Sequence, residues 1–208
     1  PAGRRNGNHR NQRSLRGMKI VIVTEPGFVK DEAGKIVGLL ESGMIERVHI
    51  RKPLWSADAM RLLLNLIPAD LHPLLSLHDH HGLASELNIG GIHLNSRNPS
   101  VPEGFSGIVS RSCHSIAELQ GAPCDYRFLS PIFDSISKQG YRSNFTPAML
   151  RQAVADGLID GTTYALGGVK PNRLPLLADW GFEGASMLGA AWGASSIQRF
   201  LSDLKECL

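Results

Sequence analysis

A short polar run, Ser112-Cys113-His114, follows a β-branched stretch and carries side chains suited to proton transfer. Successive side chains of a strand point to opposite faces, so Ser112 and His114 share a face and Cys113 points away from both. This separation disfavours a nucleophilic Cys–His pair, which needs the two side chains in contact. Histidine can gain and lose a proton near neutral pH, so we interpret His114 as a candidate general acid or base, with Ser112 beside it.

A second run, His78-Asp79-His80-His81, is rich in potential metal ligands. His78 and His80, two histidines one residue apart at a strand end, can chelate a transition metal, so a metal-dependent hydrolase is one hypothesis. The last predicted strand, residues 184–188, offers no further acidic ligand, which counts against it. Asp79 is better suited to a hard cation such as Mg2+, which prefers oxygen ligands.

Two glycine-containing pairs, Gly167-Gly168 and Leu188-Gly189, follow the last two predicted strands. Glycine lets backbone amides approach an anion closely, and a helix N-terminus can point at it. Parallel barrels commonly bind a phosphate between these two loops. Ordinary turn chemistry is the alternative, but the pairs together predict a phosphorylated ligand at Gly167, Gly168, Leu188 and Gly189.

The segment 131–144 is a long polar connection between a predicted strand that ends at Ser130 and the next predicted helix. Connections of this length in compact domains are often functional lids. Lys138 lies in the segment and could hold an anion. The alternative interpretation is a solvated loop.

Strand-like and helix-like segments alternate from Met18 onward, and they must position these residues. The eight predicted strands are Lys19–Thr24, Arg47–Arg51, Leu74–His78, Gly91–Leu94, Gly107–Ser112, Tyr126–Ser130, Thr163–Leu166 and Gly184–Leu188. Predicted helices are Asp31–Glu41, Ala57–Leu66, Ser115–Gln120, Pro147–Asp156, Asn172–Trp180 and Ser195–Lys205. Such alternation predicts an α/β fold with parallel strands, and eight units predict a (β/α)8 TIM barrel. An open doubly wound sheet is the alternative, but the turn after the first strand lacks its glycine pattern.

Composition indicates one globular domain. The 208 residues are 42% hydrophobic, enough to bury a core without covalent staples. The three cysteines lack C-x-x-C spacing, which disfavours a disulfide framework or structural zinc and favours a reduced, cytoplasmic setting. No run of about 18 apolar residues is present, so we expect no membrane partner.

The charge is divided unevenly between residues 1–17 and residues 18–208. The first segment holds five arginines and no acid, so with a net charge of +3 overall the remainder carries −2. We predict a short disordered basic tail at 1–17 and the barrel at 18–208, because the tail has too little apolar surface to fold. We do not expect nucleic-acid binding, since no aromatic residues interleave with the arginines.

Several spaced motifs together resemble those of one enzyme family. They are Arg51, the Asp79 turn, Gly91-Ile92-His93-Leu94, Ser112-Cys113-His114, Asp125-Tyr126 leading to Ser130-Pro131-Ile132-Phe133, Ser135-Ile136-Ser137-Lys138 and Ala165-Leu166-Gly167-Gly168-Val169. In order and spacing they resemble the thiamine phosphate synthase/TenI family of small (β/α)8 barrels, over nearly all of residues 18–208.

The resemblance implies one of two chemistries in thiamine biosynthesis. The synthase joins hydroxymethylpyrimidine diphosphate to a thiazole phosphate and releases pyrophosphate with the help of Mg2+. The TenI-type tautomerase aromatises a thiazole carboxylate phosphate by proton transfer, using a histidine and no metal cofactor. Either chemistry implies a small phosphorylated thiazole as the ligand.

The resemblance is incomplete on the side that would bind the diphosphate. The synthase pattern Gln-x-Arg-x-Lys reads here as His49-Ile50-Arg51-Lys52-Pro53, so the lysine position is proline. Asp79 matches the first Mg2+ ligand, but His78 stands where the family has asparagine. The second Mg2+ ligand, an aspartate, falls at or beside Asn98. Asparagine brings no charge to a metal that must hold pyrophosphate.

The resemblance is better kept on the thiazole-phosphate side. Ser135, Ser137 and Lys138 match the synthase loop Thr-x-Thr-Lys with hydroxyls and ammonium intact. Residues 111–115 match the TenI pattern Arg-Ser-x-His-Ser, which places the catalytic base at His114. The resemblance therefore favours a TenI-like tautomerase. The alternatives are a divergent Mg2+-dependent synthase, a non-catalytic thiazole-phosphate-binding regulator and the metal-dependent hydrolase. A homodimer is among the assembly states open to such a domain.

Overall fold

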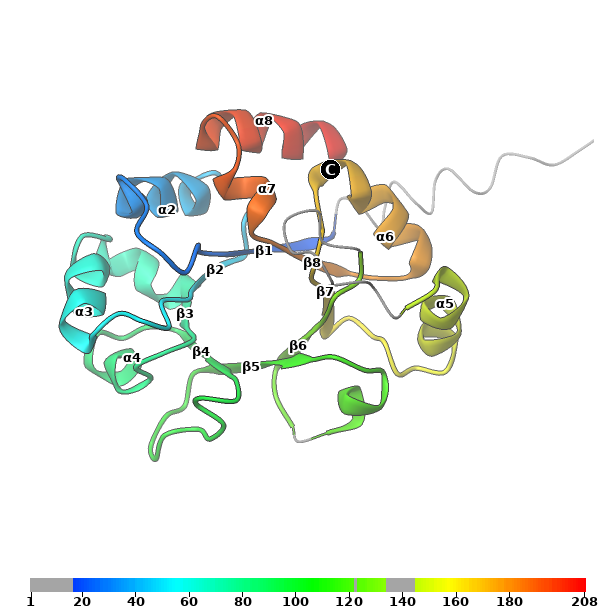
Figure 1. Ribbon diagram of the computed structural model, residues 1–208, viewed down its shortest axis with the longest axis horizontal. Coiled ribbons are helices and arrows are strands. Elements are labelled where there is room, and N and C mark those ends of the chain that lie inside the picture. The colour runs from blue at the N-terminus through cyan, green and yellow to red at the C-terminus, as the bar shows by residue number, and fades with distance from the viewer. Residues whose placement is uncertain (1–16, 122, 134–144) are drawn as a thin grey trace, which may run out of the picture.

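Eight parallel strands close into a barrel in chain order (Figure 1). The computed structural model describes residues 17–121, 123–133 and 145–208. The strands are β1 (Lys19–Val23), β2 (Arg47–Ile50), β3 (Leu75–Leu77), β4 (Gly91–Leu94), β5 (Ile108–Cys113), β6 (Tyr126–Leu129), β7 (Thr163–Ala165) and β8 (Gly184–Met187). β8 pairs with β1, where Ala185 faces Ile20, and this closes the ring. The predicted TIM barrel is confirmed, and every strand ends within one residue of its prediction.

Helices surround the barrel on the outside (Figure 1). They are α2 (Glu32–Glu41), α3 (Ala57–Asn65), α4 (Gly82–Glu86), α5 (Pro147–Ala155), α6 (Leu174–Trp180), α7 (Gly189–Trp192) and α8 (Ile197–Cys207). Short 3₁₀ helices cover Ala69–Leu74, Ala117–Gln120 and Pro171–Arg173. The start of α5 follows local chemistry, because Thr146 caps the amide of Met149 and Pro147 occupies the first turn.

Three predicted details of the helices differ from the structure. The segment predicted as a helix at 115–120 forms only a 3₁₀ turn, and the predicted helix at 172–180 is divided into a 3₁₀ turn and α6. The sequence prediction missed α4, α7 and the turn at 69–74. These elements are four to six residues long, which is too short for a helical hydrophobic repeat to show.

The barrel separates two hydrophobic layers. The larger lies between strands and helices and includes outward residues such as Ile20, Val48 and Ile92. The smaller fills the barrel interior around Tyr126, Phe128 and Tyr164. Buried polar side chains also point inward, which is unusual because barrel interiors are dominated by bulky branched apolar residues. They include Arg47, His49, Ser76, His93, Ser110 and Ser186.

One inward glycine makes room for an aromatic ring. A Cβ at Gly184 on β8 would lie 2.3 Å from Cδ1 of Tyr164 on the neighbouring strand. Any side chain at this position would therefore displace the ring. Tyr164 also donates a hydrogen bond to Glu46 at 2.9 Å. The ring thus lies against Gly184, with its hydroxyl group bound to Glu46.

No helix among the described residues is long and apolar enough to cross a membrane. The predicted tail at 1–17 falls outside the described residues except for Gly17, so its disorder and the boundary at 18 stay predictions.

Candidate active site

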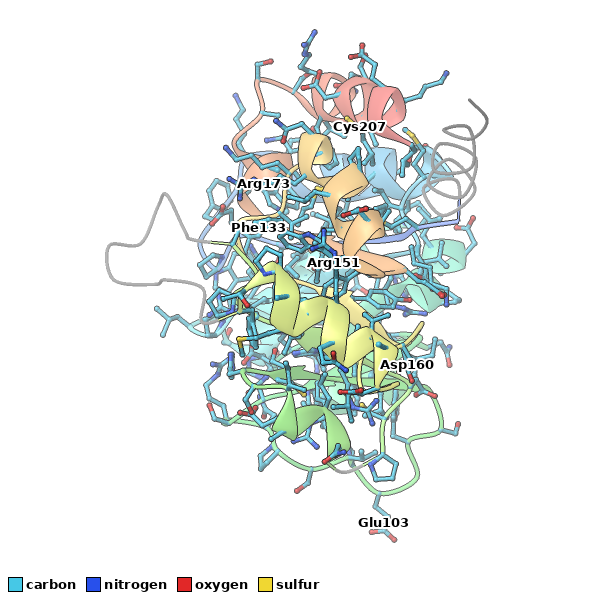
Figure 2. All side chains as sticks on the ribbon, turned by 90° about the vertical axis from the view of Figure 1, so that its right-hand side faces the viewer. Glu103, Phe133, Arg151, Asp160, Arg173 and Cys207 are labelled. Carbon is cyan, nitrogen blue, oxygen red and sulfur yellow. The ribbon has the colours of Figure 1, made fainter. Side chains whose placement is uncertain are left out.

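The polar residues predicted at the strand ends gather at the carboxyl end of the barrel. Figure 2 views the barrel from the side, with Phe133 and Arg173 toward one end and Asp160, which precedes β7, toward the other. Active sites of TIM barrels lie at the carboxyl end of the strands. We call the ends of β2, β3 and β4 the histidine side, and the ends of β5 to β8 the glycine side.

His114 lies on the glycine side, just beyond β5, and its side chain is exposed. Its Nδ1 lies 3.2 Å from the carbonyl oxygen of Ser130 and 3.3 Å from the Ser130 hydroxyl oxygen. The His114 backbone amide donates to Glu118 at 2.9 Å, which fixes the turn that presents the ring. This bond also lowers the pKa of the Glu118 carboxyl. Nδ1 is thus directed at Ser130, whereas Nε2 has no hydrogen bond among the described residues.

Cys113 and Ser112 point to opposite faces of β5, as strand alternation requires. Cys113 is fully buried beneath the outer helices, with its Sγ 3.6 Å from the carbonyl oxygen of Glu118. Burial raises the pKa of the Cys113 thiol, which keeps it protonated. Ser112 points inward, where its hydroxyl lies 2.9 Å from Nε2 of His93. Cys113 therefore has no contact with the barrel mouth, and Ser112 does.

The glycine loops after β7 and β8 differ in how closely neighbouring atoms approach them. Gly167 and Gly168 have φ angles of +94° and +64°, a region that favours glycine. A Cβ at Gly167 would lie 2.8 Å from Cα of Pro131, so the loop packs directly on the chain that follows β6. Leu188 precedes α7, and a Cβ at Gly189 would meet nothing within 4 Å.

Arg173 is a basic residue beside these loops that the sequence analysis did not identify. It donates to the Gly168 carbonyl at 2.7 Å, and its guanidinium lies 4.5 Å from the centre of the Phe133 ring. The sequence did hold a signal for it, because Arg173 follows Gly167, a glycine of the predicted phosphate loop, by six residues. Ser135, Ser137 and Lys138 lie outside the described residues, so their proposed roles rest on the sequence alone.

On the histidine side, Asp79 is paired with Arg97. The Arg97 Nη2 and Nε atoms donate to Asp79 Oδ1 at 2.8 Å and 3.1 Å. The Asp79 side chain is 8% exposed and that of Arg97 is 45% exposed, so arginine covers the carboxylate from the solvent side. Asp79 Oδ2 is buried without a hydrogen-bond partner among the described residues.

The side chains next to Asp79 donate to main-chain carbonyl oxygens. Asn95 and Asn98 both donate their side-chain amides to the His78 carbonyl oxygen, at 2.7 Å and 3.0 Å. His80 has a left-handed backbone, with φ of 55°, and its Nε2 lies 2.6 Å from the Trp55 carbonyl oxygen. His80 therefore turns away from His78, and the two do not form the chelating pair considered from the sequence.

Lys52 and Arg51 follow β2 and have different surroundings. Lys52 is fully buried, forms an ion pair with Glu32 at 2.8 Å and donates to the carbonyl oxygens of Glu25 and Gly27. Its charge thus holds the loop after β1. Arg51 is half-buried, and its guanidinium forms no ion pair with a described residue. Of these two cations, Arg51 is the one available to a ligand.

His49 and His78 join His93 in a buried cluster inside the barrel mouth. Nδ1 of His49 lies 2.9 Å from Nε2 of His78, and Nε2 of His49 contacts the Tyr126 hydroxyl. The rings of His78 and His93 stack with centres 4.1 Å apart. Burial lowers the pKa of all three imidazoles, that of His93 to about 3. The three rings are therefore uncharged at neutral pH and bring no positive charge to a diphosphate.

The Mg2+ ion implied by the family resemblance fits the histidine side poorly. Mg2+ needs hard oxygen ligands with negative charge, and Asp79 is the carboxylate at this position. The Arg97 guanidinium already neutralises it, and the Asn98 amide donates to His78. Asp79 Oδ2 is one oxygen without a partner, Asn95 Oδ1 already accepts from the Arg97 and Asn98 amides, and neither asparagine brings negative charge to a metal.

Comparison with known proteins gives a consistent family signal. A family model described as thiamine monophosphate synthase matches residues 20–191. A curated thiamine-phosphate synthase from Synechococcus sp. (strain CC9605) is 27% identical over 195 residues, covering 87% of this chain and 53% of that protein. The chain thus spans about half the length of this curated relative.

Solved structures agree with the fold. A thiamine phosphate pyrophosphorylase from Bacteroides thetaiotaomicron is 36% identical, covers 91% of this chain and 97% of its own, and superimposes with a TM-score of 0.81. A thiamine phosphate pyrophosphorylase from Pyrococcus furiosus is 18% identical, covers 93% and 96%, and gives a TM-score of 0.75. At this lower identity the second structure shows the shared fold alone.

Proposed function

The chain belongs to the thiamine monophosphate synthase family, and from this premise we propose that it is a TenI-like tautomerase of a phosphorylated thiazole. In this proposal the glycine side binds the phosphate, and His114 transfers the proton. The observation that carries it is the Arg97–Asp79 ion pair, because the carboxylate that matches the family's first Mg2+ ligand is already neutralised.

The proposed phosphate site consists of backbone amides at Gly167, Gly168 and Gly189. Gly167 and Gly168 have positive φ angles, a Cβ at Gly189 would meet nothing within 4 Å, and Arg173 lies beside Gly168 with a positive charge. Leu188 and Ser130 border this region, and Ser135, Ser137 and Lys138 belong to it by sequence. We expect the phosphate to anchor the thiazole ring near His114.

The proposed chemistry is a proton transfer within one substrate. His114 Nε2 takes a proton from one substrate carbon, and a proton is returned at another, so no co-substrate is consumed. Ser130 holds Nδ1 and thereby keeps the ring oriented. Arg51 or Lys138 steers the substrate carboxylate, and Ser112 lies next to the reaction on the inner face. A positioned acid–base group of this kind contributes about 10²–10⁴ in rate.

A Mg2+-dependent synthase is the second candidate, because one relative is named a thiamine-phosphate synthase and another a thiamine phosphate pyrophosphorylase, and Arg51 has no ion pair among the described residues. It would need the histidine side to hold a diphosphate. Pro53 replaces a lysine, Asn98 replaces an aspartate, and His49 and His78 are uncharged. Loss of one preorganised charge-stabilising group typically costs about 10²–10³ in rate.

The test measures both reactions with the same purified full-length chain. Thiazole carboxylate phosphate is supplied alone for tautomerisation, and then with hydroxymethylpyrimidine diphosphate, with and without Mg2+, for pyrophosphate release. We expect tautomerisation without added Mg2+ and no pyrophosphate release. Mg2+-dependent release with thiamine phosphate formed would overturn the proposal in favour of the synthase. Saturable binding with no turnover in either assay would leave a binding protein.

His114 is tested with a matched pair of variants. His114→Gln should lower the tautomerisation rate by about 10²-fold or more while phosphate binding changes little. His80→Gln is the control, because His80 also lies at the barrel mouth but bonds to the Trp55 carbonyl. A His114→Gln variant with the wild-type rate would show that another group moves the proton.

A further inference from the structure

Three inward histidines occupy neighbouring strands where a TIM barrel normally holds apolar residues. His49 is on β2, His78 follows β3 and His93 is on β4. Their side chains are almost completely buried, with residue exposures of 0%, 6% and 1%. One ring nitrogen from each lies within 4.8 Å of the other two. We propose that His49, His78 and His93 form a binding site for one divalent transition-metal ion of the Zn2+ class.

The donor set determines which metal the site would take. Three imidazoles without a carboxylate suit Zn2+, Co2+, Ni2+ or Cu2+, and they do not suit Mg2+ or Ca2+. Three histidines with one open position are also a known pattern for a Zn2+ site. This site is separate from Asp79, whose carboxylate is paired with Arg97.

The outer nitrogens of two histidines are held in the way metal-ligating histidines usually are. Nε2 of His49 contacts the Tyr126 hydroxyl, and Nδ1 of His93 lies 2.9 Å from the Ser110 hydroxyl oxygen. Such partners fix the ring orientation and leave the other nitrogen for the metal. His78 is held through its main chain, because two asparagine amides donate to its carbonyl oxygen.

The inner nitrogens need only a modest movement to bind an ion. Nδ1 of His49 and Nε2 of His78 already face each other at 2.9 Å. Tetrahedral bonds of about 2.05 Å place two ligand nitrogens about 3.3 Å apart. His93 must also tilt out of its stack on His78, which lies at an interplanar angle of 17°. This side-chain rotation exchanges a hydrogen bond to Ser112 for the metal.

Ser112 lies beside the fourth coordination position of the proposed metal site. Its hydroxyl lies 2.9 Å from Nε2 of His93 and its side chain is half-buried at the barrel mouth. Once His93 turns to the ion, the Ser112 hydroxyl is free to bind a water or substrate atom in the fourth position. The site would therefore be open toward the mouth, as catalytic metal sites are, instead of closed like structural ones.

The test uses the untagged full-length chain after removal of metals with a chelator. Binding of Zn2+ is measured by calorimetry and by metal analysis after gel filtration, and Co2+ is added in parallel because its visible spectrum reports tetrahedral nitrogen ligation. We expect one ion per chain and no binding of Mg2+ at this site. His93→Gln should weaken Zn2+ binding by about 10²-fold or more, and His80→Gln should leave it unchanged.

Two results would overturn the inference. One is wild-type protein that retains no stoichiometric Zn2+, and the other is equal binding by wild type and His93→Gln. If His93→Gln does not fold, Tyr126→Phe decides the question, because loss of an outer-sphere partner typically weakens metal binding about 10- to 100-fold. Weakening of that size supports the site, and unchanged affinity overturns it. These measurements do not depend on catalytic activity, so the result stands apart from that of the tautomerase assay.

Discussion

The charged and amide side chains beside Asp79 on the histidine side of the barrel mouth bond within the protein, whereas the glycine side presents glycine backbone and an exposed histidine. Asp79 binds Arg97, and Asn95 and Asn98 bind the His78 main chain. Across the barrel, Gly167 and Gly168 are half-buried with positive φ angles, and His114 is exposed. A charge already paired within the protein contributes little to ligand binding, so we expect the two sides to differ in function although both lie at strand ends.

A buried ion pair between Lys52 and Glu32 stabilises the histidine side, and breaking it should have the largest effect on the free energy of unfolding. Lys52→Met should destabilise the fold by about 3–5 kcal/mol, because it leaves Glu32 buried and unpaired at 3% side-chain exposure. Chemical denaturation measures the free energy of unfolding. The double variant Lys52→Met with Glu32→Leu is the control and should recover a large part of the loss. Equal losses in the single and double variants would contradict a buried, interacting pair.

On the glycine side, an added methyl group should destabilise the fold at Gly167 and be tolerated at Gly189. Gly167→Ala should cost about 1–3 kcal/mol, because its φ of +94° is unfavourable for alanine and its Cβ would lie 2.8 Å from Pro131. Gly189→Ala is the matched control, since its Cβ would meet no atom within 4 Å. Thermal denaturation of both variants checks this. If Gly167→Ala is as stable as the control, the loop is not fixed as described.

The fold was largely predictable from sequence because it depends on local signals. Short strand-like segments alternate with helix-like ones along the chain, and the eight strands pair in chain order. Gly167 and Gly168 follow the end of β7 and have the positive φ angles that favour glycine, and their role in binding phosphate stays a prediction.

The contacts on the histidine side were less predictable, because the residues that form them are distant from each other in sequence. Arg97 reaches Asp79 from 18 residues away, and His49 reaches Tyr126 across 77 residues. The run His78-Asp79-His80 indicated a metal pair by spacing alone. The left-handed backbone at His80 breaks that pattern, and the pairing of β3 with β2 and with β4 brings His49 and His93 to His78 instead. Spacing within one short run cannot show which side chains of neighbouring strands point inward at the same level.

Replacing Arg97 should have the smallest effect on stability, and it compares the two sides most directly. Arg97→Gln should change stability by about 1 kcal/mol or less, because the Arg97 side chain is 45% exposed and its removal opens the Asp79 carboxylate to water. It should also release Asp79 as an oxygen ligand, so Mg2+ should raise the melting temperature of the variant and leave wild type unchanged. Arg97→Lys is the control, since it keeps a positive charge beside Asp79 and should stay insensitive to Mg2+. If Mg2+ stabilises wild type as much as Arg97→Gln, then Arg97 does not block the carboxylate, and the histidine side is as open to a ligand as the glycine side.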